Sequence, residues 1–168
     1  MRSWVVFKPP AQQALHRLKY KNTYWLGETL ATIMYPALQK TGWDFEIIIP
    51  IPLSQQRRVE RGYNQVEEIA RPLAWNGNWI CQPNALQRVK HTQSQVKLNA
   101  VQRKENVKGA FQADPHLVAG KNVLILDDVI TTGATVSEAA IALKTAGAKQ
   151  VYAYSFARAL AHSDLDKI

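Results

Sequence analysis

The chain has 168 residues, of which 46% are hydrophobic, and it carries 21 Lys and Arg against 13 Asp and Glu, a formal net charge of +8. This length suits a single domain, and the lone cysteine, Cys81, excludes a disulfide framework and a zinc site built on cysteines. The positive balance favours anionic partners, either nucleic acid or a phosphorylated small molecule, although a solvated basic surface would leave the same balance.

The first forty residues predict helix. In YWLGETLATIMYPALQK the apolar residues fall on one helical face, and Pro36 predicts a kink or the last turn of that helix. The opening run MRSWVVFKPP is too short for a signal peptide, and no run reaches membrane-spanning length. We therefore expect a cytoplasmic protein without membrane insertion.

The middle of the chain predicts a strand and a second helix. FEIIIPIP, at 45–52, is a short β-branched run closed by prolines and suits a buried strand that ends in a rigid loop. A helical periodicity follows at 66–74, with Pro72 inside it, where we expect a kink or an early end. WNGNWI predicts a turn into a strand near 78–82, and the polar, basic segment 88–110 predicts a mobile, partly helical loop.

The last third predicts a strand, a helix and another strand. KNVLILDD is the first strand, TVSEAAIALKTA is a helix ended by Gly147, and QVYAYSF is the second strand. This order implies a right-handed βαβ unit in a parallel sheet. Ligands bind beyond the carboxyl ends of such strands, and we expect Asp127 and Asp128 there, at the edge of a loop.

The residues between this strand and its helix are Thr131, Thr132, Gly133, Ala134 and Thr135. Backbone N–H groups, three hydroxyls and the positive end of the helix favour a phosphate dianion, and glycine permits a tight backbone angle. The preceding acids would repel a lone phosphate, so they must face sugar hydroxyls or a magnesium ion, directly or through water. The pattern predicts a ribose 5-phosphate site; the alternative is an ordinary loop with a threonine helix cap.

This stretch closely resembles the phosphoribosyl-diphosphate (PRPP) binding motif of type I phosphoribosyltransferases. The resemblance implies their α/β fold, a mostly parallel twisted sheet flanked by helices, with a mobile hood loop. It also implies that Asp127 and Asp128 hold the ribose hydroxyls and Mg²⁺, and that residues 131–135 wrap the 5-phosphate.

Three further blocks, PIPLSQQRRVERGYNQVEEIA, RVKHTQSQ and RKENVKGAF, resemble the ComF family, which is associated with DNA uptake in competence. The segment LHRLKYKNTYWLGETLA fits the same family. ComF proteins commonly carry a Cys-rich N-terminal zinc finger, and we expect this chain to lack it. We divide its single domain, 1–168, into a helical N-terminal segment, 1–44, and a core with the PRPP site, 45–160.

The block that begins at Pro50 lies where type I enzymes carry their diphosphate loop. By resemblance, the N–H groups of Leu53, Ser54 and Gln55 face the diphosphate, and nearby arginines neutralise its charge. Solvent-facing arginines are the alternative. The candidate arginines are Arg57, Arg58 and Arg61.

The segment 88–110 corresponds to the hood loop of the same enzymes. Arg88, Lys90 and Arg103 would close over the diphosphate and exclude water, unless the loop is simply a solvated basic segment. His91 has no visible acid partner and is not assigned as a general base. Asn64 and Gln65 are either helix caps or pocket residues.

Three functions share this expected pocket. The first is an enzyme that displaces diphosphate from carbon 1 of PRPP with a nitrogen nucleophile, a pentosyl transfer assisted by Mg²⁺. The others are a non-catalytic accessory of competence or DNA uptake, and a PRPP-responsive protein that binds nucleic acid. The expected partner is PRPP, with single-stranded DNA or competence proteins as alternatives; the acceptor, turnover and homo-oligomerisation stay open.

Overall fold

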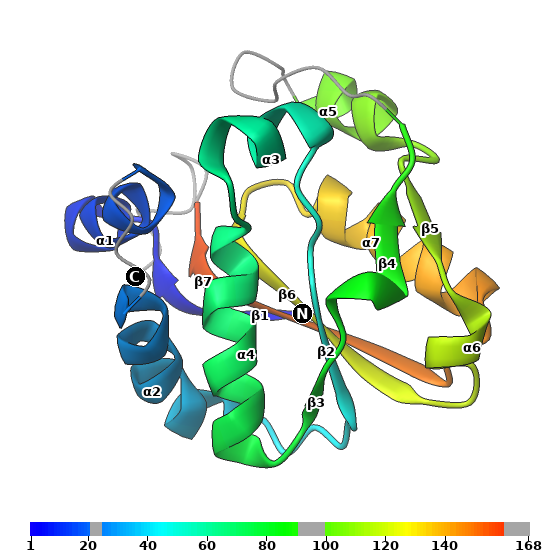
Figure 1. The fold of residues 1–168 in the computed structure, drawn as a ribbon, viewed down its shortest axis with the longest axis horizontal. Helices are drawn as coiled ribbons and strands as arrows, with labels where there is room; N and C mark the ends of the chain where they lie inside the picture. Colours follow the sequence, from blue (N-terminus) through cyan, green and yellow to red (C-terminus); the bar gives the residue numbers. More distant parts are fainter. Residues whose placement is uncertain (21–24, 91–99, 160–168) are drawn as a thin grey trace.

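A five-stranded parallel sheet forms the centre of the computed structural model, which describes residues 1–20, 25–90 and 100–159 (Figure 1). The strand order is β1-β7-β6-β2-β3, and every pair in it is parallel. The carboxyl ends of all five strands therefore lie at one edge of the sheet. The strands are β1 Arg2–Val6, β2 Ile47–Pro50, β3 Ile80–Cys81, β6 Asn122–Ile130 and β7 Gln150–Arg158.

Helices cover both faces of this sheet, as the sequence predicts. One face carries α1 (Pro9–Tyr20), α2 (Trp25–Gln39) and α4 (Gln65–Gly77). The other face carries α7 (Ala134–Thr145) and a second, antiparallel two-stranded sheet. The smaller elements are α3 Gln55–Arg61, η1 Pro83–Ala85, β4 Leu86–Arg88, α5 Ala100–Val107, β5 Phe111–Ala113 and α6 Pro115–Val118.

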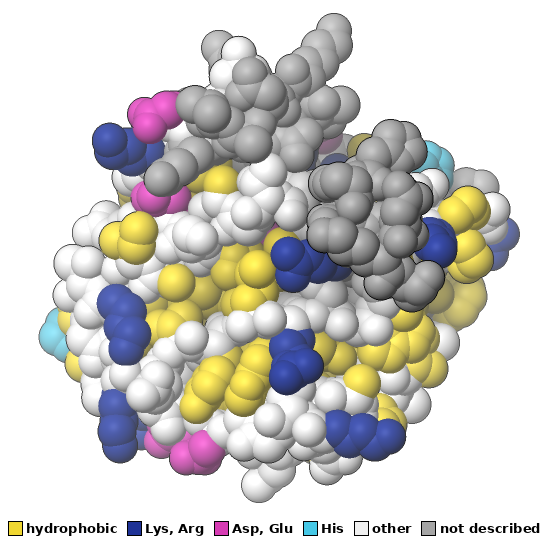
Figure 2. All heavy atoms as spheres, turned by 180° about the vertical axis from the view of Figure 1, so that it is seen from behind, with side chains coloured by type: hydrophobic (Ala, Val, Ile, Leu, Met, Phe, Trp, Pro, Cys, Tyr) yellow, Lys and Arg dark blue, Asp and Glu magenta, His cyan; other side chains and the backbone are white. Residues whose placement is uncertain are grey.

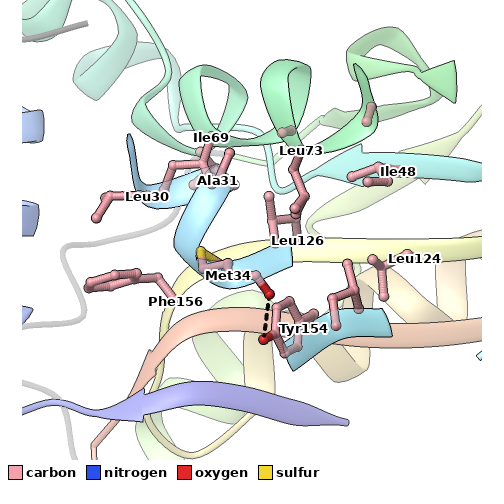
Figure 3. Packing of buried hydrophobic residues seen from close by; sticks show 14 of the residues in the cluster. Leu30, Ala31, Met34, Ile48, Ile69, Leu73, Leu124, Leu126, Tyr154 and Phe156 are labelled. Carbon is pink, nitrogen blue, oxygen red and sulfur yellow. Dashed lines mark hydrogen bonds between the residues drawn. The ribbon is translucent and has the colours of Figure 1, made fainter. Parts of the chain in front are cut away.

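Strand β6 is buried on both faces and joins the two hydrophobic cores. Leu124 and Leu126 belong to one core with α1, α2 and α4, and Figure 3 shows them beside residues of α2 and α4. Val123 and Ile125 belong to the other core, with α7. Successive side chains of a strand point to opposite faces, so this continuous apolar run supplies both cores. Because β6 is the central strand, the residues that follow Leu126 in it lie at the middle of the carboxyl edge of the sheet.

The prediction that the first forty residues are helical is wrong at their start. Arg2–Val6 forms strand β1, which pairs in parallel with β7 and places Ser3 opposite Ser155. The hydroxyl oxygens of these two serines are 2.7 Å apart. The sequence SWVVF favours a strand because it contains β-branched and aromatic residues, and the free edge of β7 provides its partner.

Pro36 and Pro72 lie inside helices, and of the two only Pro36 lies in the last turn of its helix. Pro36 is in the last turn of α2, where it was predicted. Pro72 does not end its helix, because α4 continues to Gly77. A proline cannot donate to the carbonyl four residues earlier, here that of Glu68. That carbonyl packs against Gly27 of α2, where an added Cβ would lie 2.4 Å from the oxygen.

Several other predictions are confirmed. The strands at 47–50 and 80–81 and the unit β6–α7–β7 lie where the sequence indicated. The segment 88–110 is helical at 100–107, and residues 91–99 lie outside the described part of the chain. Among the described helices, none is long and apolar enough to cross a membrane.

Candidate functional site

A cavity of about 390 Å³ opens at the carboxyl ends of β2 and β6. Its walls come from α1, the loop after β2, α3, the start of α4, β4, β6 and α7, so it combines segments that are far apart in the sequence. Many of the residues predicted for the site line it together. They are Leu53, Ser54, Arg57, Arg61, Arg88, Asp127, Asp128 and Thr135.

The two adjacent acids lie inside β6 and are each only 9% exposed. The expectation that they lie at a loop edge is therefore wrong: the strand continues to Ile130. Backbone groups hold both carboxylates in place. The N–H of Asp128 donates to Oδ1 of Asp127 at 2.8 Å, and the N–H of Val129 donates to Oδ1 of Asp128 at 2.6 Å.

The two carboxylates have different partners and therefore different proton affinities. Oδ2 of Asp128 lies 2.5 Å from Nζ of Lys19 and accepts a hydrogen bond from Nε2 of Gln65 at 2.9 Å. Burial by itself raises the pKa of Asp128, but the charge and hydrogen bond of Lys19, with the hydrogen bond of Gln65, outweigh it and hold that pKa below its ordinary value.

The neighbouring carboxyl behaves in the opposite way. Burial and the charge of Asp128 raise the pKa of Asp127 to about 8. Asp127 therefore takes up a proton more readily than Asp128 does. The oxygens of such a pair can accept hydrogen bonds, and a protonated carboxyl can also donate one, which suits sugar hydroxyls.

Arg57, Arg61 and Arg88 also line this cavity, together with one acid, Glu60. Ser54 caps α3 by accepting from the N–H of Arg57 at 3.4 Å, and this arrangement turns the start of α3 into the wall. Arg88 lies at the end of β4, its guanidinium 5.5 Å from the ring centre of Phe111. Burial, followed by the charge of Arg57, lowers the pKa of Arg88. Guanidinium groups in this setting suit a diphosphate.

The remaining predicted diphosphate and hood residues divide into three groups. Gln55 and Lys90 line a smaller adjacent cavity of about 120 Å³ that also reaches Ser54. Arg58 lines a separate cavity and does not join the site. The side chain of Arg103, and all of His91, lie outside the residues that the structure describes.

The predicted phosphate loop forms the turn between β6 and α7. Thr131 and Thr132 are exposed, and the hydroxyl of Thr132 accepts from the N–H of Ala134 at 3.4 Å. Gly133 is the N-cap of α7 with φ of +81°, a left-handed angle that glycine tolerates best. Of this loop, Thr135 lines the cavity that holds the acid pair. The first turn of α7 thus lies beside the acid pair, where its dipole favours an anion.

Asn64 and Gln65 take different roles. Asn64 is the N-cap of α4: its side chain accepts from the N–H of Val66 at 3.1 Å and donates to the carbonyl of Ile51 at 3.0 Å. Gln65 is a pocket residue, because its side chain reaches the acid pair. Of the two alternatives that the sequence left open, Asn64 is therefore a helix cap and Gln65 is a pocket residue.

Sequence reasoning missed the contribution of α1. Lys19 and Tyr20 line the cavity from the end of this helix. The guanidinium of Arg61 lies 5.1 Å from the ring centre of Tyr20 and donates to its hydroxyl at 3.3 Å, and it also donates to Oε1 of Gln65 at 2.8 Å. The only signal for Lys19 was the LKY segment of the ComF resemblance, which does not indicate its spatial partner.

The donor set fits a magnesium ion that is shared with a ligand. In the described ranges no three His, Cys, Asp or Glu side chains gather as a metal cage. Mg²⁺ commonly binds one or two carboxylates and completes its shell with water and ligand phosphate oxygens. Asp127 and Asp128 supply such carboxylates, although Lys19 already pairs with one of them.

Comparison with known proteins agrees with this arrangement. A family profile described as "Phosphoribosyl transferase domain" matches residues 61–167. Competence protein F of Haemophilus influenzae is 34% identical over 89% of this chain and 69% of its own length. DNA utilization protein YhgH of Escherichia coli K12 is 33% identical over 92% of this chain and 70% of its own length.

Solved structures show the same fold at low sequence identity. The PRPP amidotransferase of B. subtilis has a TM-score of 0.50 and 20% identity over 84% of this chain and 26% of its own. Adenine phosphoribosyltransferase of Thermoanaerobacter pseudethanolicus has a TM-score of 0.50 and 14% identity over 81% of this chain and 82% of its own. The profile and the two curated relatives carry the assignment: the chain belongs to the phosphoribosyl transferase domain family and, within it, to the ComF competence family.

Proposed function

We propose that the protein binds PRPP with Mg²⁺ in the cavity beside the acid pair and transfers the 5-phosphoribosyl group to a nitrogen nucleophile, with release of diphosphate. One observation carries the proposal: a buried acid pair, the start of α7 and a wall of arginines border the same cavity. Each of these features suits a different part of PRPP, and together they suit its ribose, its 5-phosphate and its diphosphate.

The acid pair binds the sugar in this proposal. Asp127 and Asp128 hold the 2- and 3-hydroxyls of the ribose, because backbone N–H groups fix both carboxylates before a ligand arrives. Residues 131–135 bind the 5-phosphate with backbone N–H groups and hydroxyls beside the positive end of α7. These two contacts orient carbon 1 toward the arginine wall.

The arginine wall binds the leaving group. Leu53, Ser54 and Gln55 present the start of α3 to the diphosphate, and Arg57, Arg61 and Arg88 offset its charge. Bound Mg²⁺ supplies further neutralisation of the diphosphate charge. The C1–O bond to diphosphate breaks, the C1–N bond to the acceptor forms, and the arginines stabilise the charge that develops on the departing oxygen. Arg88, with Lys90 and Arg103 of the hood loop, keeps water from carbon 1.

A thermal-shift titration with PRPP and Mg²⁺ tests binding. Ligand at about 100 times its Kd adds roughly 2.7 kcal/mol to the stability of the folded protein. The double variant Asp127→Asn, Asp128→Asn keeps the side-chain size, which matters because both positions are buried, and it should lose the shift. Asp44→Asn, which removes an exposed acid remote from the cavity, should keep it.

Equal shifts in the wild type and the double variant would contradict the assignment of the site. Turnover is tested separately by incubating the protein with PRPP, Mg²⁺ and a panel of amines and nucleobases and measuring the diphosphate released. Release that requires one acceptor identifies the acceptor. If PRPP binds but no acceptor in the panel causes release of diphosphate, the protein binds PRPP without transferring its phosphoribosyl group, and the proposed transfer is contradicted.

A second candidate function is nucleic-acid handling on the same fold. The names of the relatives refer to competence and DNA utilization, and the chain carries a charge of +8. On the described part of the face in Figure 2, however, Lys and Arg side chains are spread singly around an apolar band. Binding of single-stranded DNA that weakens steeply with salt would favour this candidate, and absence of binding at physiological salt would contradict it.

A further inference from the structure

We propose that Lys19 is a built-in counter-ion of the acid pair, so that a divalent cation must displace its ammonium group to reach Asp128. The inference rests on the proposed function for the identity of the cation but is tested without PRPP. Nζ of Lys19 lies 2.5 Å from Oδ2 of Asp128. That oxygen is one of those that a metal ion at the acid pair would need.

The position of Lys19 is imposed by α1 and by the turn between α3 and α4. Lys19 is the next-to-last residue of α1. The hydroxyl of Tyr63 donates to the backbone carbonyl of Leu18, and Arg61 contacts the following residue, Tyr20. The first contact holds the backbone just before Lys19, and the second holds the side chain of the residue just after it. The ammonium therefore reaches the acid pair from an anchored helix end.

The ion pair is partly shielded from solvent. The side chains of Lys19 and Asp128 are 22% and 12% exposed, so their attraction is stronger than that of a pair at the protein surface. The second partner of the same oxygen, Gln65, is neutral. Among the residues that the structure describes, Lys19 is thus the cation paired with Asp128, and in this proposal it occupies the position that a metal ion would take.

Loss of Lys19 should therefore strengthen metal binding. We expect Lys19→Met to lower the Kd for Mn²⁺, measured by electron paramagnetic resonance at pH 8 in the absence of PRPP, by at least tenfold. Lys19→Arg keeps a positive charge and should retain the weak affinity of the wild type. Mg²⁺ added as a competitor should displace Mn²⁺ from the variant.

Lys121→Met is the matched control. It removes the same charge and breaks the ion pair of Lys121 with Glu46, at 3.3 Å, but Lys121 lies just before the opposite end of β6. Its affinity for Mn²⁺ should equal that of the wild type. An unchanged affinity in Lys19→Met, or an equal gain in Lys121→Met, would overturn the proposal.

The chemical reactivity of Lys19 in the wild type tests the same proposal if the Lys19→Met variant does not fold. Acylation of lysines, followed by mass spectrometry, should modify Lys19 faster when saturating Mg²⁺ is present, relative to Lys121. Unchanged relative reactivity would overturn the proposal. If PRPP does not bind but the Mn²⁺ affinity changes as expected, the proposed function fails alone; if PRPP binds with Mg²⁺ and the affinity does not change, only the role of Lys19 fails.

Discussion

At the scale of single residues, Asp127 and Asp128 are adjacent and chemically identical, yet their pKa values shift in opposite directions. Asp128 faces a cation and an amide donor, whereas burial and the charge of Asp128 act on Asp127. Environments that push the pKa values of two acids apart are common in binding and catalytic sites. The raised pKa of Asp127 should make the free energy of unfolding depend on pH, even without a ligand.

Asp127→Asn should change how stability depends on pH. The pKa of Asp127 is about 8 in the folded protein and 3.8 in its reference state, so the folded protein holds a proton that the unfolded chain has lost between these values. The free energy of unfolding therefore falls as pH rises from 4 to 8. Asparagine carries no proton to lose, so the variant should be more stable than the wild type at pH 8, by at least ~2 kcal/mol.

Urea unfolding at pH 5 and pH 8 measures this difference. The lowered pKa of Asp128 does not interfere, because its contribution is complete above pH 4 and is lost only in more acidic solution. An identical pH dependence in the variant and the wild type would show that Asp127 ionises normally.

Gly133→Val tests the turn before α7. The left-handed φ of +81° is unfavourable for a β-branched residue and should cost about 1–3 kcal/mol of stability. An added Cβ would meet only the side chain of Met1, at 3.6 Å, so the cost arises from the backbone. The distorted turn should also weaken PRPP binding, measured by calorimetry.

Gly42→Val is the control for this variant. Gly42 has a similar φ of +67° and no atom within 4 Å of an added Cβ, and it does not line the site. It should lose comparable stability while binding PRPP normally. An equal loss of PRPP affinity in both variants would contradict the proposal that the turn before α7 binds the 5-phosphate.

At the scale of elements, the close contact of α2 with α4 positions the start of α4 at the cavity. Pro72 leaves the carbonyl of Glu68 without a helical donor, and Gly27 packs directly on it. Gln65, which bonds to Asp128, lies one turn before Glu68. Separation of the two helices would therefore move a residue of the site.

Gly27→Ala should force these helices apart, since its Cβ would lie 2.4 Å from the carbonyl oxygen of Glu68. Overpacking of this kind costs about 1–3 kcal/mol, a loss that denaturant unfolding resolves. Thr29→Ala, on the exposed side of the same helix, should change stability little. A Gly27→Ala variant as stable as Thr29→Ala would contradict the close contact.

Elements with a strong local pattern could be predicted from the sequence. The unit β6–α7–β7 shows clear periodicity and turn residues, and the amino-acid pattern by itself indicates a role for its acids and for Gly133. Strand β1 was missed although its β-branched and aromatic residues favour a strand, because so short a run becomes a strand only through pairing with β7 at the other end of the chain. The local signal was too weak to decide between strand and helix.

At the scale of the whole molecule, the site exists because the sheet places distant segments together. The order β7-β6-β2 puts the loop after β2 beside the acid pair of β6. The resemblance to type I enzymes predicted that Ser54 and Asp127 belong to one ligand site, and the two residues line one cavity. The sequence could not predict that Lys19 reaches Asp128, because the packing of α1 across the sheet face decides that contact.

The most direct test of the account is the ³¹P NMR spectrum of PRPP titrated with the protein in the presence of Mg²⁺. We predict that the resonances of the 5-phosphate and of both diphosphate phosphorus atoms shift or broaden with the wild type, because the proposed site contacts both ends of the ligand. All three should remain unchanged with the double variant Asp127→Asn, Asp128→Asn. Unperturbed resonances with the wild type, or equal changes with the variant, would contradict the claim that this cavity is a PRPP site.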